Sequence, residues 1–167
     1  FYDYIKSDTN KSLIFFNQNL TSNKYKTVNF LEEFFHGLRL KSFIFSKYKN
    51  NKKNIKLDIK LIEKTSQSKK NENKRFDSII EGTNLTKELV SEPGNILHPD
   101  EYAKRILKLR KIGLKVTVYD KKKLKKLGMN ALLGVGQGSI RGSYLVTVEW
   151  NGEKSNKKPL AFVGKGV

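Results

Sequence analysis

The stretch Lys64–Arg75 contains no aliphatic or aromatic side chain, whereas apolar residues recur with regular spacing on both sides of it. Such a stretch adds nothing to a hydrophobic core, so we expect a linker or a surface loop there. A chain of 167 residues fits one large domain or parts of two. The sequence therefore predicts a first part over residues 1–75, which ends in this linker, a linking helix over 76–91, and a second part over 92–167.

The first part carries the patterns of strands around one helix. Apolar residues at helical spacing predict a helix over residues 27–39. Short apolar runs predict strands at 13–16 and 42–45, and the alternation of apolar with charged residues predicts another over 55–61. So few elements do not make an independently stable sheet. We therefore expect the C-terminal part of an α/β domain.

The second part alternates helices and strands. After a break at Pro93–Asn95, the patterns predict a helix that opens at His98–Pro99 and ends near Gly113, then a short basic helix over 121–127. Apolar runs predict strands at residues 114–119, 131–135, 144–150 and 160–163. This order indicates an α/β fold whose mixed central sheet is only partly contained in the chain.

The net charge of +18 would suit a nucleic-acid or anionic-membrane partner. However, 29 of the 34 basic residues are Lys and only 5 are Arg, whereas proteins that read base edges favour the bidentate guanidinium of Arg. The lysines are also spread along the chain, with one cluster at Lys121–Lys126. We therefore expect a solvated basic surface, and a basic nucleic-acid-binding or assembly module remains the alternative hypothesis.

The residue types present exclude or disfavour membrane segments, disulfides and two kinds of metal site. No apolar run approaches the roughly 18 residues that cross a bilayer, and the N-terminus lacks the pattern of a secretory signal, so no membrane partner is expected. The absence of Cys excludes disulfides and thiolate metal sites. His36 and His98 have no paired acids around them in the sequence, so we expect no histidine-based metal site.

Two glycine-rich elements follow predicted strands. The first, Gly134–Ser139, lacks the G-x-G-x-x-G spacing and the following helix of a dinucleotide-binding loop. The second, Gly164–Gly166, lacks the upstream glycine and the hydroxyl residue of a P-loop. Taken by themselves, the first indicates a tight turn that needs unusual backbone angles, and Lys165 is typical of a solvated turn residue. No catalytic residue and no substrate-binding residue is predicted.

Four stretches, in this order and spacing, resemble the leucyl (cytosol) aminopeptidase family: Asn84–Asn95, Leu127–Ser139, Val148–Gly152 and Phe162–Val167. The run Gly37–Phe43, followed by Lys47–Lys49, is similar to the end of the family's N-terminal domain. The resemblance covers about residues 30–167. The sequence departs from the family in having His98 where Thr is common and Gly94 where Ala is common.

The resemblance implies a cytoplasmic metallo-aminopeptidase that removes N-terminal residues from peptides. Full-length members form hexamers and use two divalent metal ions, zinc or manganese, for metal-assisted hydrolysis. One metal ligand in the family is the lysine of Val-Gly-Lys-Gly, which is Lys165 here. An amine binds a metal only when it is neutral, and nearby dications and desolvation both disfavour the ammonium form.

The family's carboxylate ligands would lie beyond Val167, so we expect this chain to be an internal fragment of a longer protein. A single amine does not hold a divalent cation, because such ions take several oxygen or nitrogen donors. We therefore expect no tight zinc or manganese site, and no aminopeptidase activity, from these 167 residues alone.

Overall fold

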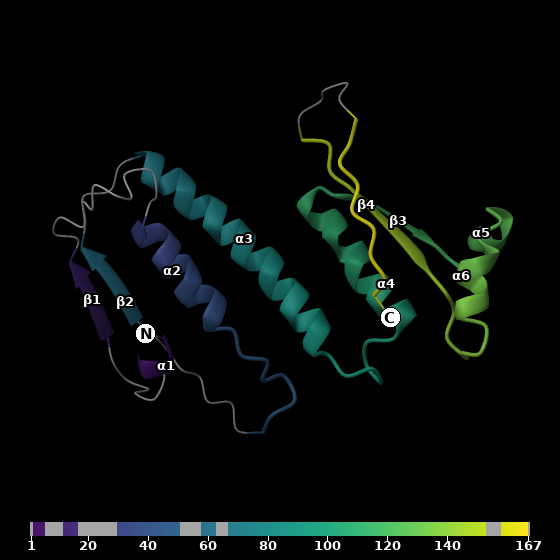
Figure 1. Cartoon of the computed structure of the whole chain (residues 1–167), viewed down its shortest axis with the longest axis horizontal. Helices are drawn as coiled ribbons and strands as arrows, with labels where there is room; N and C mark the ends of the chain where they lie inside the picture. The colour runs from purple at the N-terminus through teal and green to yellow at the C-terminus, as the bar shows by residue number, and fades with distance from the viewer. Residues whose placement is uncertain are drawn as a thin grey trace. The chain divides into compact units, whose positions relative to one another are not determined.

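The computed structural model describes residues 2–5, 12–16, 30–50, 58–62, 67–152 and 158–166. The chain divides into two compact units, Phe1–Ser91 and Glu92–Val167, each with its own two-stranded sheet (Figure 1). No helix in the described ranges has the length and apolar character to span a membrane. The assignment of the units to an N-terminal domain and a catalytic domain stays a prediction.

The first unit contains a parallel strand pair. Its elements are α1 (Tyr2–Ile5), β1 (Ser12–Phe16), α2 (Phe30–Lys41), β2 (Asp58–Ile62) and α3 (Gln67–Ser91). Strands β1 and β2 run parallel, with Ser12 opposite Asp58 and Phe16 opposite Ile62. Parallel neighbours need a crossover connection, which is usually helical. Helix α2 lies in this connection, so the first unit includes a β–α–β arrangement.

Helices α2 and α3 pack against each other (Figure 1). Leu38 of α2 is buried, as are Phe76 and Ile80 of α3. The ring of His36 lies 4.7 Å from the ring of Phe76, centroid to centroid. Near the end of α2, the ammonium group of Lys87 donates a hydrogen bond to the carbonyl oxygen of residue 40. The ring contact and this hydrogen bond therefore join α2 to α3 within the first unit.

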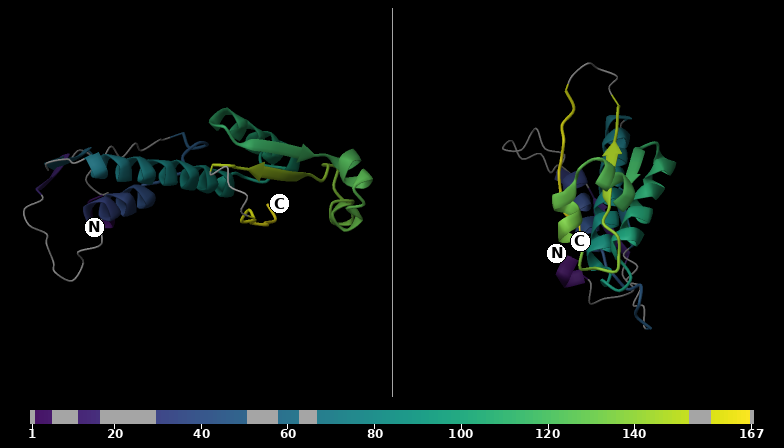
Figure 2. Two further views of the ribbon diagram at one scale, coloured as in Figure 1. Left: turned by 90° about the horizontal axis from the view of Figure 1, so that it is seen from above. Right: turned by 90° about the vertical axis from the view of Figure 1, so that its right-hand side faces the viewer.

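The second unit is an antiparallel ribbon flanked by helices (Figure 2). Its elements are α4 (Pro99–Leu107), the 3-10 helix η2 (Lys108–Ile112), β3 (Lys115–Tyr119), α5 (Lys121–Lys126), α6 (Asn130–Val135) and β4 (Leu145–Glu149). Strands β3 and β4 pair antiparallel, with Lys115 opposite Glu149 and Tyr119 opposite Leu145. Helix α4 packs on both strands, and α5 contacts β3 and α6.

The core of the second unit is centred on Val116 and Leu124, which are 1% and 0% exposed. Leu124 is the single apolar residue of α5, so it anchors that helix while the five lysines stay exposed. The Asp120 carboxylate caps α5 by accepting a hydrogen bond from the backbone N–H of Lys123 at 2.9 Å. Gly128 follows α5 with φ of +71°, a left-handed conformation that favours glycine at helix C-termini.

Most predicted elements are present, with ends shifted by a few residues. The expected helices over 27–39, 98–113 and 121–127 are α2, α4 with η2, and α5, and the expected strands at 13–16, 114–119 and 144–150 are β1, β3 and β4. The strand expected over 55–61 is β2, which is described from Asp58. Residues 27–29 and 55–57 lie outside the described ranges.

The predicted linker over 64–75 was wrong from residue 67 onward, because α3 already begins there. The lack of apolar side chains excludes a position in the core, but it does not exclude a helix. Lys, Gln, Glu and Arg are good helix formers, and this stretch is rich in them. The linking helix expected over 76–91 is therefore the second part of a longer helix.

Three strands were predicted wrongly. Residues 131–135 form the helix α6, since a run of Ala and Leu favours a helix and five residues are too few to show a period. Residues 43–46 are irregular after α2 ends. The segment 160–163 is also irregular, and Phe162 and Val163 are 90% and 99% exposed. Strands need a pairing neighbour, and neither apolar run has one among the described strands.

Candidate functional site

Helix α4 carries most of the polar side chains of the candidate site. Pro99 stands in its first turn with Asp100 and Glu101 beside it, which is the arrangement that a helix N-terminus favours. His98 is the N-cap residue and has extended backbone angles, but its side chain does not cap the helix. Instead, its ring atom Nδ1 is in hydrogen-bond contact with Oδ1 of Asp100. At this position, where Thr is common in the family that the sequence resembles, His98 therefore contacts the Asp100 carboxylate and does not cap the helix.

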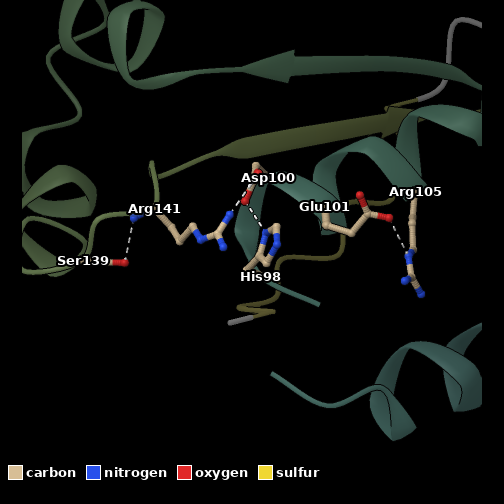
Figure 3. Close-up of polar contacts among 6 residues, drawn as sticks. All are labelled: His98, Asp100, Glu101, Arg105, Ser139 and Arg141. Carbon is tan, nitrogen blue, oxygen red and sulfur yellow. Dashed lines mark hydrogen bonds and ion pairs between the residues drawn. The ribbon is translucent and has the colours of Figure 1, made fainter. Parts of the chain in front are cut away.

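Asp100 joins the start of α4 to the loop that follows α6 (Figure 3). Besides contacting His98, its Oδ2 atom lies 3.7 Å from Nη1 of Arg141. The backbone N–H of Arg141 donates to the hydroxyl of Ser139 at 3.1 Å, which orders the end of the glycine-rich loop. Burial raises the pKa of Asp100, but the hydrogen bonds from His98 and the backbone, with the nearby charges of His98 and Arg141, outweigh burial and lower it overall.

Arg105 links α4 to the start of the second unit. Its Nη1 atom donates to Glu92 at 2.8 Å, and its Nε atom donates to Glu101 at 3.1 Å. The Glu92 side chain is 1% exposed and that of Arg105 is 18% exposed, so this is a buried ion pair. The hydrogen bonds to Glu92 and then Glu101 raise the pKa of Arg105, and the bond from Arg105 lowers the pKa of Glu101.

Acid is expected to weaken the second unit through Asp100 and Glu101. The pKa of each carboxyl is lower in the folded chain than its ordinary value. Their stabilisation is therefore fully present above the ordinary carboxyl pKa of about 4, and it is lost as the pH falls through the folded values. We expect Asp100→Asn to make the melting temperature, followed by circular dichroism, fall less steeply with acid. An unchanged slope in this variant would contradict the expectation.

The glycine-rich loop closes on itself, as predicted for a tight turn. The backbone N–H of Ser139 donates to the carbonyl oxygen of Gly136 at 3.1 Å. A Cβ atom on Gly136 would overlap the hydroxyl oxygen of Ser143. The predicted reason for this glycine was wrong, because Gly136 has φ of −90° and needs no left-handed conformation. A side chain at position 136 would therefore require the Ser143 hydroxyl to rotate away from the main chain.

Lys165 lies in the irregular segment 158–166, and it is exposed. Its two neighbouring glycines have different surroundings. A Cβ atom on Gly166 would overlap ring atom Cε1 of Tyr102, which belongs to α4, whereas a Cβ atom on Gly164 would meet nothing within 4 Å. The structure therefore brings the lysine segment next to α4 through Gly166.

A metal centre needs several oxygen, nitrogen or sulfur donors close together. Within the described ranges, no group of three or more His, Cys, Asp or Glu side chains could hold a metal ion. His36 packs on Phe76, and His98 contacts Asp100, so the two histidines have separate structural partners. Lys165 by itself offers one nitrogen donor, and divalent ions take several donors. The described residues alone do not fit a two-metal centre, and the role of Lys165 stays a prediction.

Most of the polar contacts of α4 are not indicated by the sequence. Only Glu101 and Arg105 carry a local signal, since they are four residues apart on one helix and so face each other. Glu92 and Arg141 lie far from their partners along the chain, and nothing in their spacing indicates the contacts. The helical spacing of Tyr102 predicts a position in the core. It does not indicate the contact of Tyr102 with Gly166.

Comparison with known proteins identifies the family. The model of the cytosol aminopeptidase family, catalytic domain, matches residues 84–167. A probable cytosol aminopeptidase of Phytoplasma mali is 49% identical in an alignment of 138 positions that covers 78% of this chain and 28% of the relative. A probable cytosol aminopeptidase of Nitrobacter winogradskyi is 40% identical over 136 residues, with 78% and 27% covered. The chain thus spans little more than a quarter of the length of these relatives.

Solved structures show the same fold. A mutant of tomato leucine aminopeptidase aligns with a TM-score of 0.79 at 21% identity, and the alignment covers 94% of this chain and 32% of that one. The bottromycin maturation enzyme BotP in complex with Mn aligns with a TM-score of 0.58 at 24% identity, with 70% and 24% covered. Both confirm the α/β class. With the sequence match over its second half, the chain belongs to the cytosol aminopeptidase family.

Proposed function

We propose that this chain is part of a metal-dependent aminopeptidase that removes N-terminal residues from peptides in the cytoplasm. The observation that carries the proposal is the match of residues 84–167 to the catalytic domain of the cytosol aminopeptidase family. The identity of 49% to a probable cytosol aminopeptidase supports it. The manganese in the BotP structure supports metal dependence, with two manganese or zinc ions and a hexameric assembly as the finer proposals.

Within this protein, Lys165 is proposed as one metal ligand. Its segment Phe162–Val167 has the lysine between two glycines that the family resemblance assigns to the metals. A free lysine amine has a pKa of about 10.4, so it coordinates only where a positive neighbour or desolvation removes its proton. Lys165 is exposed in the described structure. Further donors, and the walls that would exclude water from it, must come from outside the described residues.

The isolated chain of 167 residues is expected not to hydrolyse leucine amide, with or without added Mn²⁺ or Zn²⁺. One amine binds such ions too weakly to hold them. The longer reading frame that contains this chain is expected to encode a protein that does hydrolyse it. Release of leucine should be measured for both proteins under the same conditions. Metal-dependent hydrolysis by the short chain would contradict its inactivity, and an inactive, folded, metal-loaded longer protein would contradict the proposed function.

A basic nucleic-acid-binding module remains the second candidate. One observation favours it: α5 exposes five lysines around the buried Leu124. Binding to phosphates through these lysines would release counterions and would weaken steeply as the salt concentration rises. Affinity for duplex DNA that is unchanged between low and physiological salt would exclude this candidate. It ranks second because it does not account for the family match of residues 84–167.

A further inference from the structure

We propose that Asn151 and Gly152 form a site of spontaneous chemical modification, at which the side-chain amide of Asn151 becomes a carboxylate. The inference goes beyond the proposed aminopeptidase function and does not depend on it. No other Asn in the sequence is followed by Gly. The argument rests on the chemistry of this pair and on where the fold of the second unit places it.

The reaction is an attack of the main chain on the side chain. The backbone nitrogen of Gly152, after losing its proton to a base in solution, forms a bond to Cγ of Asn151. The bond from Cγ to the side-chain nitrogen breaks, and ammonia leaves. Water then opens the resulting succinimide ring at either of its carbonyl carbons, which gives aspartate or isoaspartate. One neutral amide is thus exchanged for one carboxylate, and no oxidant or reductant is needed.

The residue that follows Asn governs how easily this ring closes. An intramolecular reaction depends on how often its two reacting atoms reach attack distance in the right orientation. Glycine has no Cβ atom, so no side chain on residue 152 obstructs the approach of its nitrogen to Cγ of Asn151. Its backbone also adopts conformations that other residues avoid. The sequence therefore places the most reactive Asn pair of the chain at residues 151–152.

The fold holds neither residue of the pair in a hydrogen-bonded structure. Strand β4 ends at Glu149, which is the last residue paired with β3, so Asn151 and Gly152 lie beyond the ladder. Within the described ranges, neither residue takes part in a hydrogen bond. Both are exposed, and Trp150 before them is 81% exposed. Base and water therefore reach the site, and the main chain can turn to bring the two atoms together.

Three other described Asn residues have more restrained surroundings. Asn84 lies within helix α3, and its side-chain oxygen is buried. Asn130 begins helix α6. After Asn95, the backbone N–H of Ile96 donates to the carbonyl oxygen of Pro93 at 2.9 Å. A helical or hydrogen-bonded main chain keeps the next nitrogen away from Cγ, and each of these residues is followed by a side chain. They serve as controls within the same molecule.

The modification is expected to leave the second unit folded. The new carboxylate would stand two residues from Glu149, whose ion pair with Lys115 is exposed on both sides. Exposed ion pairs contribute little to stability, and the buried centre of this unit is formed by Val116 and Leu124. The modified chain should therefore accumulate as a folded protein, with its net charge lowered by one from +18.

The experiment follows the unchanged chain during incubation at mildly alkaline and mildly acidic pH. Trypsin cleaves after Lys and Arg, and it releases residues 142–154 as a peptide whose single Asn is Asn151. By mass spectrometry, this peptide should gain the mass of water less that of ammonia, in both aspartate and isoaspartate forms, and faster at alkaline pH. Peptides 76–87, 88–104 and 127–141 contain Asn84, Asn95 and Asn130 and should change far more slowly. A sample digested before incubation corrects for change during digestion.

A variant and an unfolded sample separate the effect of the sequence from that of the fold. An added barrier of about 1.4 kcal/mol slows a reaction about tenfold, and we expect Gly152→Ala to slow the conversion by at least this factor. The added methyl group meets the ring of Trp150, which is exposed and can turn into solvent. Unfolding in guanidinium chloride should change the rate at Asn151 little and should raise the rates at Asn84 and Asn130.

The proposal is overturned if Asn151 in the folded chain converts no faster than Asn130. It is also overturned if the conversion appears only in guanidinium chloride, because the fold would then protect the site, or if Gly152→Ala converts as fast as the unchanged chain. No metal and no peptide substrate is present in these measurements. Their result is therefore independent of whether the longer protein hydrolyses leucine amide.

Discussion

Replacing Lys165 by Met in the longer aminopeptidase that is proposed to contain this chain is expected to abolish its activity. Methionine keeps a long unbranched side chain but removes the nitrogen that is proposed to bind metal. Loss of an outer-shell partner of a metal site costs roughly 10- to 100-fold in metal affinity or activity. Loss of a ligand should cost at least as much, so we expect a fall of about 100-fold or more in kcat/KM for leucine amide.

A matched control is available in the same segment. Lys158 is also an exposed lysine of the irregular stretch 158–166, and Lys158→Met changes net charge by the same amount. It should leave kcat/KM and the bound metal, measured by elemental analysis, unchanged. If Lys165→Met keeps full activity and full metal content, Lys165 is not a ligand. An equal loss in both variants would point to charge or folding as the cause.

Replacing Glu92 by Ala is expected to destabilise the second unit by about 3 kcal/mol, the lower end of the range for breaking a buried ion pair. The change leaves the guanidinium of Arg105 in a largely buried place without its main partner, since the Glu92 side chain is 1% exposed and bonds to Arg105 at 2.8 Å. The lower end applies because Arg105 retains Glu101. Urea unfolding followed by circular dichroism measures the loss.

Two further variants show whether the loss of stability comes from the buried Glu92–Arg105 ion pair or from the contact within helix α4. Glu101→Ala removes the outer, partly exposed partner of Arg105 on the same helix, so its effect should be much smaller. Glu92→Gln keeps an oxygen that can accept the bond and should lie between the unchanged chain and Glu92→Ala. Equal losses for Glu92→Ala and Glu101→Ala would show that burial of Glu92 does not govern the stability of this contact.

The sequence by itself predicted those features that depend on residues close together in the chain. Helix α5 was predicted over 121–127, and the structure adds that a cap at Asp120 and a glycine at 128 lie directly next to it. Strand β3 was predicted from the apolar run at 114–119, and the α/β class follows from the order of such elements. The family could also be predicted from the sequence, because four short stretches that resemble it occur in the same order and spacing. Helix caps, turns and periodic patterns act over a few residues, so they can be read without the fold.

The tertiary structure alone decided the features that need a partner far away in the chain. Residues 131–135 are apolar enough for a strand, yet they form α6, and the apolar residues 160–163 form no strand. The pairing of β1 with β2 joins residues more than 40 positions apart. Tyr102 and Gly166 meet only because α4 and the lysine segment come together in the second unit. Pairing and close packing depend on which surfaces folding brings into contact, and no local pattern of residues contains that information.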